Sequence, residues 1–173
     1  GLLSQVTYER FSGTSVLRDF VEFPSQIFEH WALEPEVLRR HALHHATGEP
    51  IPDAMLERFH AARRFNQGFE TVEYTACALI DMALHAHDDP AGIDITAFEA
   101  EFLARIGMPR EIVLRHRLPH FGHLFGSPGY AAGYYVYMWA EVLDADGYNA
   151  FVEAGDPFDP AIAARLLKYV YSA

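Results

Sequence analysis

The chain has 173 residues, half of them hydrophobic, which is enough for one domain with its own core and too few for two comfortable ones. Lys and Arg number 13 against 24 Asp and Glu, so the formal charge at pH 7 is −11, which disfavours binding to nucleic acid and to anionic lipid. No hydrophobic run approaches the roughly 18 to 20 residues that cross a bilayer, and we expect neither nucleic acid nor a membrane among the partners.

Hydrophobic residues recur at helical spacing along most of the chain. Phe20, Phe23, Ile27 and Trp31 step by three or four residues, and no segment alternates clearly with a period of two. We therefore predict an all-α fold. The expected helices cover residues 18–46, 53–87, 95–106, 110–117, 130–154 and 159–171, with turns rich in Pro and Gly between them. The second helix is long enough that we expect Gly68 to bend or break it.

The single cysteine lies in a hydrophobic run. Cys77 has no partner for an internal disulfide, and residues 76–80 around it are all apolar, so we expect a reduced thiol in the core. The N-terminus lacks a basic region followed by an apolar one, as a signal peptide would have. These features favour a cytoplasmic location, and a periplasmic one stays open.

The segment Arg18-Asp19-Phe20-Val21-Glu22-Phe23-Pro24-Ser25-Gln26, followed by Glu29-His30-Trp31, is the first candidate site. In a helix, Glu22, Gln26 and Glu29 fall at i, i+4 and i+7 and form one polar stripe. A carboxylate is a ready zinc ligand, but a catalytic zinc site needs three protein ligands. From the residues alone, Glu22 and Glu29 are interpreted as solvated helix charges.

The second candidate segment runs from His120 to Leu143. In a helix, Tyr130, Tyr134 and Tyr137 fall at i, i+4 and i+7, which would place three phenols on one face, and glycines precede and interrupt them. Phenols are suitable hydrogen-bond donors to the oxyanion that forms when a peptide carbonyl is attacked. On spacing alone, the same stripe fits the buried face of a helix.

Both segments resemble those of the thimet oligopeptidase, neurolysin and peptidyl-dipeptidase family of zinc metallopeptidases, and among its bacterial members the peptidyl-dipeptidases in particular. The similarity covers almost the whole chain, from residues 1–3 through 65–70 to 140–146. The resemblance implies the helical part of a zincin-like, neurolysin-type catalytic domain and zinc-dependent hydrolysis of short peptides. It does not distinguish release of dipeptides from internal cleavage.

Site residues follow from the resemblance by position. Glu22 corresponds to the third zinc ligand, and Glu29 to a group that could orient a zinc-binding histidine. His123 would bind the substrate backbone. Tyr130 and Tyr137 would stabilise the tetrahedral intermediate.

The family's other two zinc ligands and its general base lie in a His-Glu-x-x-His motif, which occurs nowhere in the 173 residues. We therefore expect residues 1–173 to be a single helical domain, the C-terminal portion of a larger catalytic domain truncated at both ends. Alone, it should be inactive and hold zinc weakly or not at all. The remaining tyrosines of the second segment, Tyr134 and Tyr135, are expected to pack.

Other patterns with possible chemistry lack a necessary residue. His41 and His45 are one helical turn apart, but position 42 is alanine where this type of metallopeptidase needs the glutamate base, so we interpret them as surface histidines. His85 and His87 are interpreted as a helix end that enters a solvated acidic turn. No Gly-x-Ser-x-Gly motif occurs, and a serine nucleophile is not indicated.

Two alternatives to a peptidase fragment stay open. The chain could be a non-catalytic helical module that self-associates as a homo-oligomer through exposed apolar surface. It could also be a natural stand-alone protein that uses its Tyr and His residues for binding.

Overall fold

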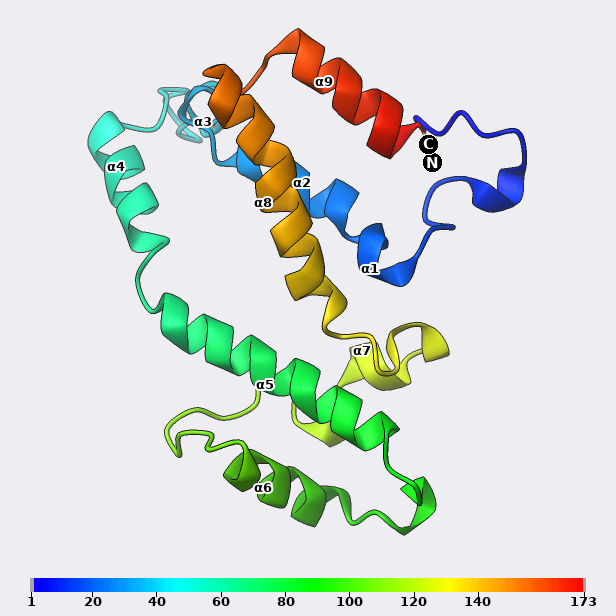
Figure 1. Ribbon diagram of the computed structural model, residues 1–173. Helices are drawn as coiled ribbons and strands as arrows, with labels where there is room; N and C mark the ends of the chain where they lie inside the picture. The colour runs from blue at the N-terminus through cyan, green and yellow to red at the C-terminus, as the bar shows by residue number, and fades with distance from the viewer. Residues whose placement is uncertain (1, 173) are drawn as a thin grey trace. The chain divides into compact units, whose positions relative to one another are not determined.

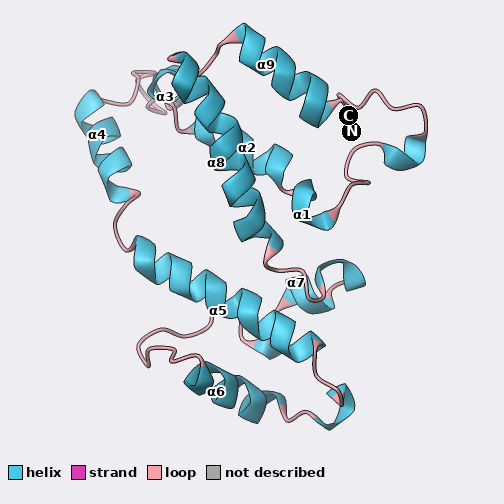
Figure 2. Ribbon diagram, in the orientation of Figure 1, coloured by secondary structure: helices cyan, strands magenta, loops and turns pink. Residues whose placement is uncertain are grey.

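The computed structural model describes residues 2–172, and the regular elements in this range are helices and helical turns (Figures 1 and 2). The one β contact among them is an isolated bridge between Leu43 and Pro50. The predicted all-α fold is confirmed. No helix in the described range is long and apolar enough to cross a membrane.

The chain divides into two compact units. Unit 1 is built from the chain up to His60 and from Val136 onward, and unit 2 from Ala61–Tyr135. The expectation of a single domain over the whole chain stays a prediction.

Unit 1 contains the helices that precede His60 and those that follow Tyr135. Its elements are η1 (Glu9–Phe11), α1 (Arg18–Val21), α2 (Phe23–Ala32), α3 (Pro35–His41), α4 (Asp53–Ala62, which runs two residues into unit 2), α8 (Val136–Ala154), α9 (Pro160–Leu166) and the π-helical turn η5 (Leu167–Tyr171).

Helix α8 packs against α1 and α2, and the contact with α2 forms the core of unit 1 (Figure 1). Phe23 and Ile27 of α2 and Ala140 of α8 are buried there. Gly147 of α8 lies so close to α2 that a Cβ atom on it would meet Ile27 Cδ1 at 3.0 Å and two ring carbons of Phe23 at 3.2 Å. The helices α2 and α8 can therefore approach this closely because Gly147 has no side chain.

A polar network joins the same two helices. His30 Nε2 of α2 lies 2.7 Å from Oδ1 of Asp144, which is buried on α8. The His30 ring also stacks on Tyr148, one turn further along α8, at a centroid distance of 4.4 Å. The Tyr148 hydroxyl donates to Glu34 at 2.5 Å. Burial, with the bond to Glu34 and its negative charge, raises the pKa of the Tyr148 phenol.

Unit 2 is organised around one long helix, α5 (Gln67–His85), which packs against α6 (Ile95–Arg105). Its remaining elements are η2 (Pro90–Gly92), η3 (Leu118–His120), α7 (Gly122–Phe125) and η4 (Pro128–Tyr130). Cys77 of α5 is fully buried, as predicted, and burial raises the pKa of its thiol.

The predicted helices over residues 18–46 and 53–87 are each divided in the structure. Pro35 starts α3, and the residue before it, Glu34, is extended, because a following proline disfavours the helical conformation. The division between α4 and α5 precedes Gly68. The turn between the two helices ends at Asn66. Its φ of 58° is left-handed, a conformation that asparagine tolerates better than most residues.

The predicted helix over residues 110–117 does not form. Helix α6 ends in a turn at Gly107, with φ of 70°, and Met108 N–H donates back to Leu103 O at 2.9 Å. The chain then returns to α6, where buried Glu99 pairs with Arg117 and accepts the Leu118 N–H at 3.0 Å. The Glu99 carboxylate therefore holds the end of this segment against α6 through the Arg117 side chain and the Leu118 N–H.

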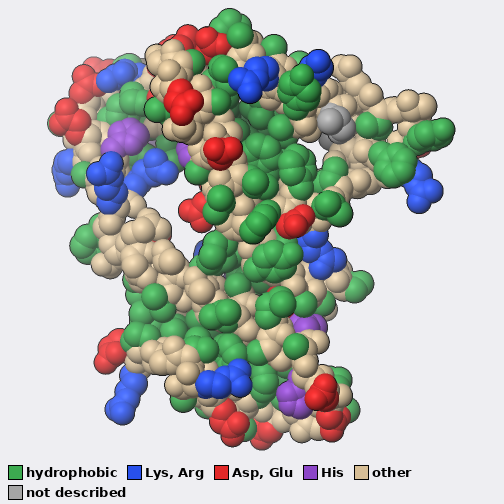
Figure 3. All heavy atoms as spheres, viewed as in Figure 1, with side chains coloured by type: hydrophobic (Ala, Val, Ile, Leu, Met, Phe, Trp, Pro, Cys, Tyr) green, Lys and Arg blue, Asp and Glu red, His purple; other side chains and the backbone are tan. Residues whose placement is uncertain are grey.

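Many hydrophobic side chains remain on the surface, as the green atoms of Figure 3 show for the face drawn. Large ones with more than half of their surface exposed occur on α8 at Trp139 and Val142, and on η5 at Tyr169. Unit 1 also has an apolar groove of about 380 Å³ whose walls include Phe28, Trp31 and other residues of α2, α9 and η5.

Replacing Gly147 by alanine is expected to lower the free energy of unfolding by about 1 kcal/mol, because the overpacking against Phe23 and Ile27 exceeds the gain in helix propensity. Gly68→Ala is the matched control: Gly68 is exposed on α5, a Cβ there meets no atom within 4 Å, and the change should stabilise by up to about 1 kcal/mol. Urea unfolding measures both. Equal stabilisation by the two variants would contradict the close packing of α2 and α8.

Candidate functional site

Glu22 lies at the junction of α1 and α2. Its backbone is helical, with φ of −86° and ψ of −18°, and its carbonyl accepts the Gln26 N–H at 3.0 Å. Pro24 occupies the first turn of α2, where its missing N–H costs nothing. The polar stripe of Glu22, Gln26 and Glu29 therefore keeps its helical spacing, with Glu22 partly buried and Glu29 exposed.

Gln26 connects this segment to the start of α8. Its side-chain Nε2 donates to the backbone carbonyl of Tyr137 at 3.1 Å, although 111 residues separate the two. Its Oε1 is buried and accepts no hydrogen bond from the described part of the chain. Unit 1 thus brings the helices that carry Glu22 and Tyr137 into direct contact.

The predicted helical stripe of three tyrosines is wrong. Tyr130 ends the turn η4, Tyr134 lies outside any helix, and only Tyr137 belongs to α8, which begins at Val136. Between them, Ala132 has a left-handed φ of 54°. We call residues 127–135 the tyrosine loop. Its backbone bonds to side chains of α5 instead of forming another turn of α8.

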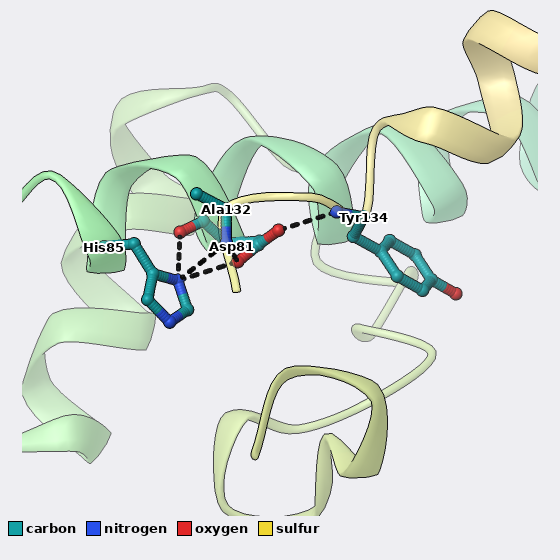
Figure 4. Close-up of polar contacts among 4 residues, drawn as sticks. All are labelled: Asp81, His85, Ala132 and Tyr134. Carbon is teal, nitrogen blue, oxygen red and sulfur yellow. Dashed lines mark hydrogen bonds and ion pairs between the residues drawn. The ribbon is translucent and has the colours of Figure 1, made fainter. Parts of the chain in front are cut away.

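Asp81 of α5 holds the tyrosine loop (Figure 4). Its carboxylate is fully buried. Oδ1 accepts the Ala132 N–H and Oδ2 accepts the Tyr134 N–H, both at 2.9 Å. His85 Nδ1 lies 2.8 Å from Oδ1. A buried charge needs such partners, because an unpaired carboxylate would cost several kcal/mol.

Tyr134 is a packing residue, as expected. Only 4% of its surface is exposed. Its ring stacks on Tyr74 at 5.0 Å and meets Phe121 edge-on at 4.7 Å, and the Tyr74 hydroxyl donates to the Tyr134 carbonyl. Tyr135, by contrast, is 41% exposed and does not pack in the core.

His123 and Tyr130 lie together in unit 2. His123 is exposed on α7, and its ring meets that of Tyr130 nearly at right angles, with centroids 5.6 Å apart. The ring of His116 is also nearby, with its centroid 6.2 Å from that of the His123 ring. Burial lowers the pKa of His116, and the positive charge of Arg115 lowers it further. Two residues predicted to contact substrate are therefore neighbours, with His123 exposed and Tyr130 partly buried.

Sequence reasoning missed Asp81 and the contact that His85 makes with it. His85 ends α5 and an exposed acidic turn follows it, as expected, but its side chain is only 25% exposed and contacts buried Asp81. A signal existed: Tyr74, Asp81 and His85 fall at i, i+7 and i+11, within about 40° of one another around a helix. An acidic residue in the middle of an otherwise apolar helix face indicates a specific partner.

The histidine pair near residue 42 does not have metal-ligand geometry. Helix α3 ends at His41, so His41 and His45 are not one helical turn apart. Within residues 2–172, no group of three or more His, Cys, Asp or Glu side chains is placed to hold a metal ion.

Comparison with known proteins identifies the family. The family model described as peptidase family M3 matches residues 1–168. The chain is 43% identical to dipeptidyl carboxypeptidase of Escherichia coli (strain K12), over 90% of this chain and 23% of that protein. It is 39% identical to oligopeptidase A of Salmonella typhimurium, over 89% of this chain and 23% of that protein. It is 37% identical to the probable cytosolic oligopeptidase A of Arabidopsis thaliana, over 79% of this chain and 20% of that protein.

The chain thus spans about a quarter of the length of these relatives. The family match nevertheless covers both candidate segments and the whole of α5, which carries Asp81. With the family model matched over nearly all of its residues, the chain belongs to peptidase family M3.

Proposed function

We propose that this chain is the C-terminal part of the catalytic domain of a zinc-dependent peptidase that cleaves short peptides. The observation that carries the proposal is the match to peptidase family M3 over residues 1–168, together with 43% identity to a relative named dipeptidyl carboxypeptidase. We call the longer protein that would contain this chain the complete peptidase. A cytoplasmic location accords with the unpaired buried Cys77 and with the name of the cytosolic Arabidopsis relative.

The donor set of the described residues fits zinc only in part. Glu22 is a partly buried carboxylate at a helix junction and suits one oxygen ligand. The remaining ligands would come from a His-Glu-x-x-His helix elsewhere in the complete peptidase. Bound zinc would supply an activated water and polarise the substrate carbonyl. Glu29, one turn beyond Gln26, would orient a ligand through a hydrogen bond.

The phenols and His123 would act on the substrate itself. A phenolic hydroxyl donates a hydrogen bond without carrying charge, which stabilises the oxyanion more than the neutral carbonyl from which it forms. We assign this role to Tyr137 and Tyr130. His123, exposed beside Tyr130, would bind the backbone of the peptide.

In the complete peptidase, Tyr137→Phe is expected to lower kcat by about 10² to 10³, with a much smaller change in KM, because one donor to the oxyanion is lost. Tyr135→Phe is the matched control: it removes a phenol two residues away that is exposed and has no assigned role. Steady-state hydrolysis of a short synthetic peptide measures both. Equal kinetics for the two variants would remove Tyr137 from the reaction.

The 173-residue chain by itself is expected to retain close to zero zinc after incubation with zinc and desalting, because Glu22 alone does not make a site. Elemental analysis measures the ratio. The complete peptidase should hold about one zinc per chain. Glu22→Gln should lower this zinc content, because it keeps the shape of the side chain but removes its charge. One zinc per isolated chain, with peptide cleavage, would contradict the proposed incomplete site.

Exposed apolar surface favours the second candidate function, a non-catalytic module that self-associates. The apolar groove of unit 1 and the exposed side chains of α8 could be covered by another copy of the chain. If so, sedimentation velocity of the 173-residue chain at micromolar concentration will show a dimer or larger species. A monomer at all concentrations would eliminate this candidate.

A further inference from the structure

The buried carboxylate of Asp81 uses its two oxygens for two different backbone donors. Oδ1 accepts from Ala132 and Oδ2 from Tyr134, each at 2.9 Å. Hydrogen bonds to a buried, ionised acceptor are among the stronger ones in proteins. The carboxylate therefore spans Gly133 and fixes the backbone on both sides of it.

His85 supports the carboxylate from the next turn of α5. Its Nδ1 lies 2.8 Å from Asp81 Oδ1 and 3.0 Å from the Asp81 backbone carbonyl. These two oxygens are acceptors, so we assign the proton to this nitrogen, which then donates. The longer contact of Ala132 N with the same nitrogen, 3.3 Å, cannot then be a hydrogen bond, and the Ala132 N–H donates to Asp81.

These bonds fix a backbone conformation that would otherwise be unfavourable. Ala132 has a left-handed φ of 54°, which is unfavourable for a residue with a Cβ atom. The next residue, Gly133, donates its N–H to the Tyr130 carbonyl at 2.8 Å. The fixed backbone at Ala132 and Tyr134 is thus connected directly to Tyr130, whose ring lies against His123.

We propose that Asp81 and His85 are positioning residues of the peptidase: they hold the tyrosine loop so that the Tyr130 phenol stays beside His123, where the substrate binds. Neither residue touches substrate, and both act through Tyr130. The proposal rests on the peptidase function proposed above. If so, catalysis depends on the Asp81 carboxylate, which is buried on α5 and takes no part in the reaction itself.

Asp81→Asn in the complete peptidase tests the geometry, and Asp94→Asn is a matched control. Asparagine keeps one acceptor oxygen and places an NH₂ donor where the other stood, so at position 81 one backbone N–H loses its partner. Asp94 also accepts two backbone N–H groups, from Thr96 and Ala97, but both bond to the same oxygen, Oδ1, at 3.0 Å. Asparagine can replace Asp94 without loss.

Two measurements on these variants are expected to separate them. Hydrogen–deuterium exchange of peptides covering residues 130–135 should be at least tenfold faster in Asp81→Asn than in the parent or in Asp94→Asn. The value of kcat should fall about tenfold or more in Asp81→Asn and stay unchanged in Asp94→Asn. Zinc content, measured on the same samples, should be equal in all three.

A double-mutant cycle with Tyr130→Phe distinguishes positioning from a general loss of structure. If Asp81 acts through Tyr130, Asp81→Asn will lower kcat little further in a Tyr130→Phe background. If it only maintains the fold, the two losses will multiply, and the positioning role is overturned. Should Asp81→Asn fail to fold, His85→Ala replaces it in the cycle, and His85→Asn, whose amide can donate in place of Nδ1–H, should restore most of the loss.

The outcomes also separate this proposal from the one on which it rests. A parent protein that does not hydrolyse peptides overturns the peptidase function, and the positioning role with it. An active parent whose Asp81→Asn variant matches Asp94→Asn in exchange and in kcat leaves the peptidase function standing and overturns the positioning role alone.

Discussion

Helix α8 approaches α2 closely because Gly147 has no side chain to keep them apart. This contact joins the beginning and the end of the chain, and the rest of unit 1 is arranged around it: the core at Phe23 and Ile27, the pair of His30 with Asp144, and the Gln26 bond to the Tyr137 carbonyl. Glu22 and Tyr137 thereby lie on one packed pair of helices.

Buried carboxylates have a similar organising role. Asp81, Glu99 and Asp144 are the buried acidic side chains among the described residues, and each bonds to a segment at least 18 residues away from it in sequence. Because an unpaired buried charge is costly, each of them favours one arrangement of its partner over all others. In unit 2, this effect gives defined conformations to two connections outside the α-helices, residues 110–118 and the tyrosine loop.

Local sequence signals were sufficient to locate most of the helices. Apolar spacing identified most of the helical segments correctly, and Pro35 marked a helix start that could have been predicted from the restriction it places on Glu34. The failed helix over residues 110–117 and the late start of α8 have another cause. Both segments can form helical hydrogen bonds, but their backbone or side chains bond instead to Glu99 or Asp81, which sequence spacing does not reveal.

The sequence by itself determined the helical class, the buried thiol at Cys77 and the family, because apolar spacing and the residues of the two candidate segments are local properties of the chain. Only the tertiary structure decided that the tyrosines of the second segment do not share a helix face, and that Asp81 and His85 hold the loop between them. The physical reason is that a buried carboxylate takes the nearest available donors in space. For Asp81 these donors are backbone N–H groups about 50 residues further along the chain.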